Sequence, residues 1–282
     1  LGDVYKRQLV WLDDVIEPLW LAACDTPAFR RGTVAQVDFD TTPLPQEVEQ
    51  VSITKLGSHV SQRLAGVIVQ ALEAVATRLS ERSGELGRLD SVAGDGDHGI
   101  GMTRGSQAAL AEARRVRGDG AGAASTLSAA GLAWSEHAGG TSGALWGAVL
   151  TGFGAVLGDE DRADKDAIRQ AARAALDAVT RLGGAKTGDK TMVDAMIPFV
   201  TTLESSADPL PQAWESACRA ADAAAQATSE MTAKIGRARP LGEKSLGTPD
   251  PGAMSFCEVV VAVGSVLSTS CLLYTSDAAD EE

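Results

Sequence analysis

Three aspartates and a histidine lie among five glycines in the stretch LDSVAGDGDHGIGMTRG, residues 89–105. The glycines allow tight turns, so the carboxylates of Asp90, Asp95 and Asp97 can converge in a loop between two helices. Two carboxylates about 4 Å apart repel by roughly 4 kcal/mol at an effective dielectric constant of 20, so converging ones need protonation or a bound cation. Since hard oxygen ligands favour magnesium or calcium, the stretch indicates a divalent-cation site.

Other interpretations of this stretch must be considered. A lone DGD sequence is more often a solvated turn than a metal site. A calcium EF-hand fails at two positions, because Gly99 and Ser106 stand where that loop requires Asp or Asn and then Glu. His98 could be a metal ligand, but magnesium prefers oxygen, which favours a contact between His98 and a nucleotide or phosphate.

Two further glycine-rich stretches precede predicted helices. In GGTSGALWG, residues 139–147, Thr141 and Ser142 stand at a helix start, where backbone N–H groups and hydroxyls can hold a phosphate. An ordinary helix N-cap is the alternative. In LGEKSLGTPDPGAMS, residues 241–255, Asp250 and the Pro-Gly that follows it stand just before the last helix, where they could simply form a turn.

A fourth stretch, GGAKTGDKTM at residues 183–192, approaches a phosphate-binding loop. Asp189 stands between Gly188 and Lys190, however, and no strand precedes the stretch, so it is not a Walker A motif. Four polar, glycine-rich stretches among Ala-rich helices together indicate a nucleotide and magnesium site at one end of a helical bundle.

The elements that must position these stretches are helices. From about residue 58, apolar residues recur at intervals of three and four, at Val60, Leu64, Val67, Ile68, Leu72, Val75 and Leu79. Ala-rich segments with the same spacing occupy residues 101–117, 122–138, 142–157, 164–182, 189–205, 210–235 and 252–268. The last contains EVVVAVGSVL, which is β-branched enough for a strand, but no second strand candidate could pair with it. We therefore predict an all-α bundle of eight helices.

Composition excludes several functions. The 25 basic residues against 38 acidic ones give a net charge of −13, which argues against a nucleic-acid or anionic-membrane partner. The four cysteines form no CxxC pair, which favours a reducing, cytoplasmic setting. Neither a long apolar span nor a signal peptide is evident, so we expect no membrane association.

The four glycine-rich stretches follow the order and spacing of the L domain, the nucleotide-binding part of dihydroxyacetone kinases, and the resemblance covers residues 55–270. It implies an antiparallel eight-helix barrel with the nucleotide at its mouth, ATP as phosphoryl donor with ADP as product, and two magnesium ions on Asp90, Asp95 and Asp97, the catalytic and metal-binding residues. The residues that would surround the nucleotide are His98, Gly99, Ile100, Gly101, Thr141, Ser142, Gly183, Met192, Arg237, Asp250, Pro251 and Gly252.

Some of these positions have plainer interpretations. Some family members carry Asn or Thr where Gly101 stands, although GDGDHGIGM still resembles a branch closer to kinases of four-carbon ketoses. Met192 could be only a core residue, and Arg237 could be a surface cation near a helix C-terminus. His59 and His137 belong to no motif and are expected to be structural.

The segment before the helices resembles the end of the K domain, the substrate-binding half of the same kinases. Residues 9–32 carry this resemblance, and residues 33–54 read as a linker. The fusion implies the single-chain, ATP-dependent form rather than the split form, whose L subunit keeps ADP and is recharged by a phosphotransferase-system protein. We expect residues 1–8 and 271–282 to be translated adaptor sequence outside the fold.

We expect most of the K domain to be missing from this chain, which would limit what the chain can do alone. In the family a K-domain histidine holds the ketose covalently, as a hemiaminal, so the chain should bind nucleotide but phosphorylate neither dihydroxyacetone nor erythrulose by itself. A homodimer is expected for the full-length form. Two other functions remain open, namely a regulatory module that senses nucleotide and a helical scaffold that needs no magnesium.

Overall fold

A computed structural model describes residues 13–22, 25–26, 29–30, 56–161, 163–236 and 238–269. The chain divides into two compact units, Leu1–Gln50 and Val51–Glu282. In the first, the described residues form one short helix, α1 (Ile16–Leu21), and an antiparallel pair of two-residue strands, β1 (Asp25–Thr26) and β2 (Phe29–Arg30). Residues 1–8 and 271–282, which we interpret as adaptor sequence, lie outside the described residues.

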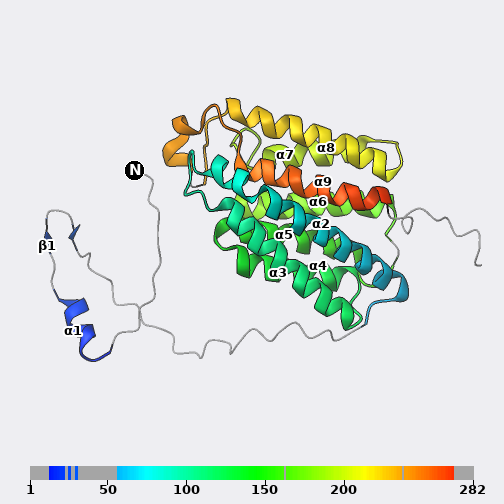
Figure 1. The fold of residues 1–282 in the computed structure, drawn as a ribbon, viewed down its shortest axis with the longest axis horizontal. Helices are drawn as coiled ribbons and strands as arrows, with labels where there is room; N and C mark the ends of the chain where they lie inside the picture. Colours follow the sequence, from blue (N-terminus) through cyan, green and yellow to red (C-terminus); the bar gives the residue numbers. More distant parts are fainter. Residues whose placement is uncertain are drawn as a thin grey trace, which may run out of the picture. The chain divides into compact units, whose positions relative to one another are not determined.

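The second unit confirms the prediction of eight long helices (Figure 1). They are α2 (His59–Asp90), α3 (His98–Gly118), α4 (Ala123–Ala138), α5 (Gly140–Leu157), α6 (Lys165–Gly183), α7 (Met192–Ser205), α8 (Leu210–Ala227) and α9 (Pro251–Thr269). Two 3₁₀ segments, η1 (Thr228–Glu230) and η2 (Arg239–Ser245), lie between the last two. Each helix packs against the next, and α9 packs against α2, so the eight helices close into a ring.

Small residues bring the helices close together. A Cβ added at Gly131 of α4 would lie 2.9 Å from the carbonyl oxygen of Gly147 in α5, and the reverse substitution gives the same distance. The ring is closed by charge as well as by packing, because the buried Glu258 of α9 accepts hydrogen bonds from Arg78 at 2.5 Å and Arg82 at 3.0 Å in α2. Removing both arginines would leave the buried carboxylate of Glu258 without a compensating charge.

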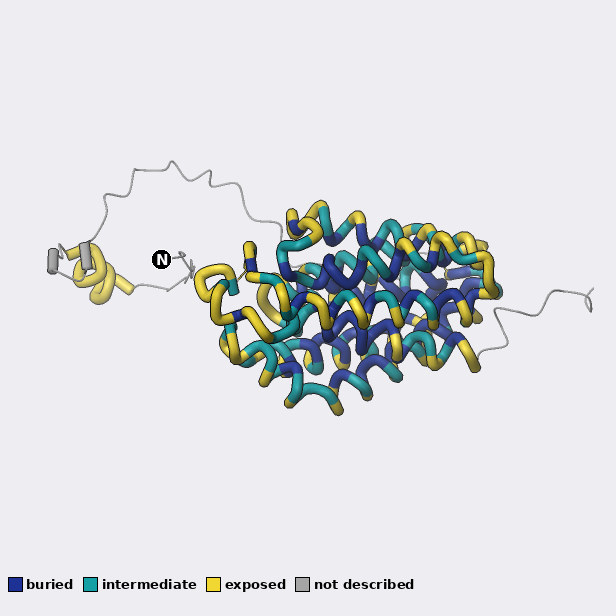
Figure 2. Tube along the Cα trace, turned by 90° about the horizontal axis from the view of Figure 1, so that it is seen from above, coloured by how far each residue is buried: buried dark blue, intermediate teal, exposed yellow. Residues whose placement is uncertain are grey.

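The core runs along the inside of the ring, as the dark blue positions in Figure 2 show. Its centre is aromatic: Trp134 stacks on Trp146 at 5.1 Å, and Phe199 meets Trp214 edge to face at 5.0 Å. An apolar cavity of about 160 Å³ lies among these side chains. Since truncating a buried aromatic side chain costs about 3–5 kcal/mol, this cluster is a main source of stability.

Four predicted boundaries were wrong. The helix predicted from residue 101 begins at His98, where Gly99 allows the first turn of α3 to rest on α2. Asp90 is the last residue of α2 rather than part of the following loop, because the buried Leu86 extends the apolar face of the helix past Gly84. The helix predicted for residues 210–235 ends at Ala227, where the Thr228 hydroxyl donates to Ala225 O and accepts from Asp250 N. The helix predicted from residue 189 begins at Met192, after a Thr191–Asp194 capping box.

Two helices, α5 and α9, are long and apolar enough to cross a membrane by length and composition. Both are members of the closed ring and pack against neighbours on either side. Among the described residues, 28% of the apolar window of α5 and 50% of that of α9 are buried inside the bundle.

The ring topology determines where the four glycine-rich stretches meet. Successive helices run in opposite directions, so the connections after α2, α4, α6 and α8 all lie at one end of the bundle. The connections after α3, α5 and α7 lie at the other. The first set contains all four stretches singled out in the sequence.

Candidate functional site

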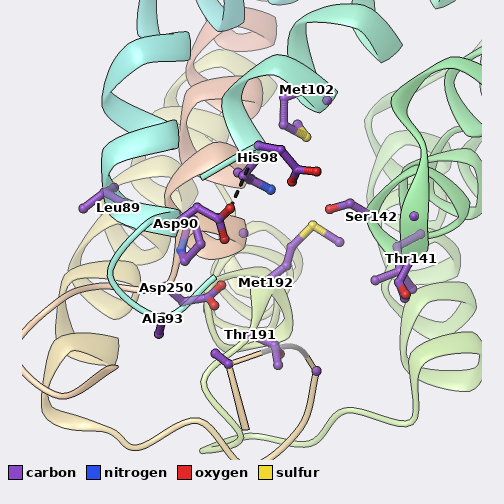
Figure 3. A pocket seen from close by; sticks show the side chains of 18 of the residues that line it. Leu89, Asp90, Ala93, His98, Met102, Thr141, Ser142, Thr191, Met192 and Asp250 are labelled. Carbon is purple, nitrogen blue, oxygen red and sulfur yellow. Dashed lines mark hydrogen bonds between the residues drawn. The ribbon is translucent and has the colours of Figure 1, made fainter. Parts of the chain in front are cut away.

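A pocket of about 510 Å³ lies at the end of the bundle where the four stretches meet (Figure 3). Asp90 and His98 stand on one side of it, Thr141 and Ser142 face them from the other, and Met192 lies between. A pocket of this volume is in the range of small-molecule and cofactor sites.

The acidic side of the pocket is a cluster of three carboxylates. One oxygen from each of Asp90, Asp95 and Asp97 lies within 4.8 Å of the others, and Asp95 and Asp97 are exposed. The backbone holds Asp90 in place: its Oδ2 accepts hydrogen bonds from Gly96 N at 2.9 Å and His98 N at 3.4 Å. This arrangement offers several hard oxygen atoms to one small volume, as a divalent cation requires.

Glycine is required where this loop turns. Gly96 has φ +79°, a left-handed conformation that residues with a Cβ rarely adopt. A Cβ at Gly99 would collide with the Ser83 carbonyl group of α2, so glycine allows the first turn of α3 to rest directly on that helix.

The opposite side of the pocket is the start of α5. Its N-cap is Gly139, which has no side chain to bond the first-turn N–H groups, and Thr141 and Ser142 stand in that turn. The predicted alternative, an ordinary N-cap formed by Thr141 or Ser142, is therefore wrong. By contrast, Asp194 caps α7 from within, accepting from Thr191 N at 2.8 Å. An uncapped helix start is suited to bind an anion.

Asp250 begins the third side of the pocket, just before α9. Its Oδ2 accepts a hydrogen bond from Ala253 N at 2.8 Å. Burial, together with a smaller effect of the nearby Asp194 charge, raises the pKa of Asp250 to about 7, against the opposing effects of the Ala253 N–H and the Lys190 ammonium.

The structure brings most of the predicted site residues to this pocket. Those that line it are Asp90, Asp97, His98, Gly101, Thr141, Ser142, Met192, Asp250, Pro251 and Gly252. Asp95 completes the carboxylate cluster. Gly99, Ile100 and Gly183 are described but do not line the pocket, and Arg237 lies outside the described residues.

Two of these residues have a second role. Met192 is buried in the core and also lines the pocket, so the two interpretations of it are compatible. The Nε2 atom of His98 makes a 3.0 Å hydrogen bond with the Ser255 hydroxyl of α9. This bond fixes the imidazole of His98 against α9.

Sequence reasoning missed several residues of the pocket lining. His137, expected to be only structural, lies in it, and its Nδ1 is 2.9 Å from Ala133 O. Arg104 also lines it, and within the described ranges no hydrogen bond or ion pair engages its guanidinium. His137 could have been found because it directly precedes the GGTSG stretch, and Arg104 because it follows the three aspartates by two turns of helix.

Comparison with known proteins assigns the family. The DAK2 domain matches residues 92–265, and the chain belongs to this family. The resemblance to the L domain of dihydroxyacetone kinases is thereby confirmed.

Individual relatives agree with this assignment. The chain is 48% identical to the L-erythrulose 1-kinase of Mycolicibacterium smegmatis, covering 92% of this chain and 46% of that protein. It is 34% identical to the ADP-binding subunit DhaL of the PEP-dependent dihydroxyacetone kinase of Escherichia coli, covering 67% of this chain and 90% of that subunit. The chain spans under half the length of the erythrulose kinases that it matches.

A solved structure has the same fold. The dihydroxyacetone kinase from C. freundii in complex with AMP-PNP and Mg²⁺ matches with a TM-score of 0.55 and 25% sequence identity, over 78% of this chain and 38% of that one.

Proposed function

We propose that this chain is the nucleotide-binding part of an ATP-dependent ketose kinase, and that its pocket holds ATP with two magnesium ions. The observation that carries the proposal is the pairing of three converging carboxylates with an uncapped helix start across one pocket. The first attracts cations and the second attracts anions, which together match a metal-bound polyphosphate.

The carboxylates fit magnesium by their chemistry. Asp90, Asp95 and Asp97 supply only oxygen donors, and two of the three side chains are exposed, so water can complete the coordination. When bound, magnesium would offset the negative charge of the triphosphate. The complex of a related kinase with AMP-PNP and Mg²⁺ supports this assignment.

The chain's own groups would position the nucleotide. We assign the phosphates to the first-turn N–H groups and hydroxyls of Thr141 and Ser142, and the remaining contacts to the lining residues near Met192 and Asp250. Arg104 adds a positive charge to the lining of the pocket. Gly99, Ile100, Gly183 and Arg237 stay predictions from the family resemblance.

The phosphoryl acceptor would come from a K-type domain. We propose a four-carbon ketose, because the relative at 48% identity is named an erythrulose kinase whereas the dihydroxyacetone kinase subunit is 34% identical. We also propose that residues 9–32 are the end of such a domain and residues 33–54 a linker. The pocket end of the bundle would orient and neutralise the phosphates, while the acceptor hydroxyl is aligned by the second domain.

Reconstitution tests this function. The purified chain, mixed with erythrulose and Mg–ATP, should give no product above background. Adding a K-type domain from a related erythrulose kinase should produce phosphorylated ketose and ADP in equal amounts. Product formation by the chain alone would contradict the proposed division of labour.

One alternative is specific enough to test in the same assay. The likeness to an ADP-binding subunit of a PEP-dependent kinase suggests that bound ADP could serve as a phosphoryl carrier. That function requires a phosphocarrier protein, so activity with ATP alone supports our proposal, and activity only with the phosphocarrier supports the alternative.

A further inference from the structure

The lysine of the GGAKTGDKTM stretch stands where a phosphate-binding lysine would be sought, yet its ammonium is already engaged. Lys190 is 5% exposed and donates hydrogen bonds to Met231 O at 3.0 Å, to Thr248 O at 2.7 Å and to Ser245 O. An ammonium has three N–H groups, so these three carbonyl groups satisfy it completely.

The backbone conformation of Lys190 also depends on the contacts around it. Lys190 has φ +63°. Among the described residues, no other residue with a Cβ has a positive φ. This conformation costs a residue with a Cβ on the order of 1 kcal/mol, so surrounding contacts must hold it. Burial lowers the pKa of Lys190, and the nearby charge of Asp250 opposes that effect.

The three carbonyl groups belong to one wall of the pocket. This wall, the described residues 231–236 and 238–248, lies between η1 and the start of α9 and contributes Ile235, Gly236, Ala238, Ser245 and Thr248 to the pocket lining. It contains the seven-residue 3₁₀ segment η2 and has no long helix of its own. Its shape therefore depends on attachments to the rest of the bundle.

Lys190 attaches this wall at both of its ends. Met231 lies at the beginning of the wall, and Ser245 and Thr248 lie at its end, so a single ammonium draws the two together. Other hydrogen bonds also hold the wall. Lys234 N donates to Asp189 O at 3.2 Å, and within the wall Ala233 N donates to the Ser245 hydroxyl at 3.2 Å. Lys190 itself lines the pocket, as do Thr191 and Met192, which directly follow it.

We infer that Lys190 is a positioning residue: its ammonium holds this wall of the pocket in place and so sets the nucleotide affinity, without binding the phosphates itself. This inference rests on the proposed nucleotide site. It also gives the GGAKTGDKTM stretch a role different from that of a phosphate loop.

The test compares Lys190→Met with Lys186→Met, a matched change of an exposed lysine in the same connection. Mg–ATP, Mg–ADP and AMP are titrated into each full chain. We expect Lys190→Met to weaken all three about tenfold or more and by similar factors, because a displaced wall affects every nucleotide. Lys186→Met should bind as the wild type does. A loss for Lys190→Met that grows with the number of phosphates would overturn the inference, since it would indicate direct phosphate binding.

Amide hydrogen exchange measures the stability of the wall directly, without a nucleotide. In Lys190→Met without nucleotide, amides of residues 231–248 should exchange at least about tenfold faster, while those of the core helix α7 keep their protection. Unchanged exchange in the wall would overturn the inference. This measurement needs no ligand, so it separates failure of the inference from failure of the proposed function, which would appear as absence of Mg–ATP binding in the wild type.

A second variant, Ser245→Ala, tests the inference even if Lys190→Met does not fold. Ser245→Ala removes the hydroxyl that accepts from Ala233 N and donates to Gly242 O at 2.6 Å, and so loosens the same wall without removing a cation. We expect it to weaken binding of the three nucleotides by similar factors, less than Lys190→Met does. Full wild-type affinity in Ser245→Ala would contradict a role for the wall in binding.

Discussion

Asp159, at the end of the bundle opposite the pocket, and the exposed pair Asp95 and Asp97 at the pocket are used in different ways. At the end opposite the pocket, Asp159 accepts hydrogen bonds from Ser125 N at 3.1 Å and the Ser125 hydroxyl at 2.6 Å, and so caps α4, whose own N-cap is Gly122. At the pocket end, Asp95 and Asp97 converge with Asp90 on a small exposed volume.

This difference separates stability from function. An aspartate that caps a helix stabilises the fold by satisfying backbone N–H groups. Carboxylates brought together repel one another, so their arrangement costs free energy until a cation binds. Variants of Asp159 and of Asp97 should therefore have opposite effects on stability and on nucleotide binding.

The largest effect is expected for phosphoryl transfer. In the assay reconstituted with a K-type domain, Asp97→Asn should lower the rate by a factor on the order of 10³, because the carboxylate that helps hold the metal is lost while the shape of the residue is kept. Helical content measured by circular dichroism should be unchanged. Asp159→Ala serves as the control and should keep the wild-type rate at a temperature where it is folded.

For stability, we expect the variant of Asp159 to have the larger effect. Asp159→Ala should lower the free energy of unfolding by about 1–2 kcal/mol, since two hydrogen bonds at the start of α4 are lost. Asp97→Asn, measured without magnesium, should not lower it. Urea denaturation of both variants tests this, and equal destabilisation would remove the distinction between the two ends.

A pH-dependent effect is expected at Asp250. Because burial raises its pKa to about 7, the folded protein keeps a proton that the unfolded chain releases near pH 4. The wild type should therefore lose stability relative to Asp250→Asn as the pH rises from about 4 to 7, by up to about 1.4 kcal/mol per pH unit, with no further change above that range. Denaturation of both proteins across this range, without nucleotide, measures the difference. A difference that is constant with pH would contradict the raised pKa.

The smallest effect is expected at the two ends of the chain. If residues 1–8 and 271–282 are adaptor sequence, deleting both segments should shift Tm by no more than about 1 °C. Differential scanning calorimetry of the shortened and the complete chain tests this. A decrease of several degrees would show that these segments belong to the fold.

Much of this arrangement could be predicted from the sequence, because local patterns determine it. Apolar spacing gave the eight helices, and alternation of helix direction brings the four glycine-rich stretches to one end. The role of Lys190 could not be predicted, since its acceptors lie 41, 55 and 58 residues further along the chain. The end of α8 was missed for a similar reason: Thr228 bonds Asp250, 22 residues away, and no local pattern shows this contact.

The most direct test of the central claim is a calorimetric titration of ATP into the full chain, with Mg²⁺ and with EDTA. The same titrations are done on the Asp95→Asn/Asp97→Asn double variant. We expect the wild type to bind one ATP in magnesium and to lose at least about a hundredfold in affinity, roughly 2.7 kcal/mol, in EDTA. The double variant should show the weak affinity in both buffers. Equal affinity of the wild type with and without magnesium, or wild-type affinity in the double variant, would contradict the assignment of the metal-bound nucleotide to this pocket.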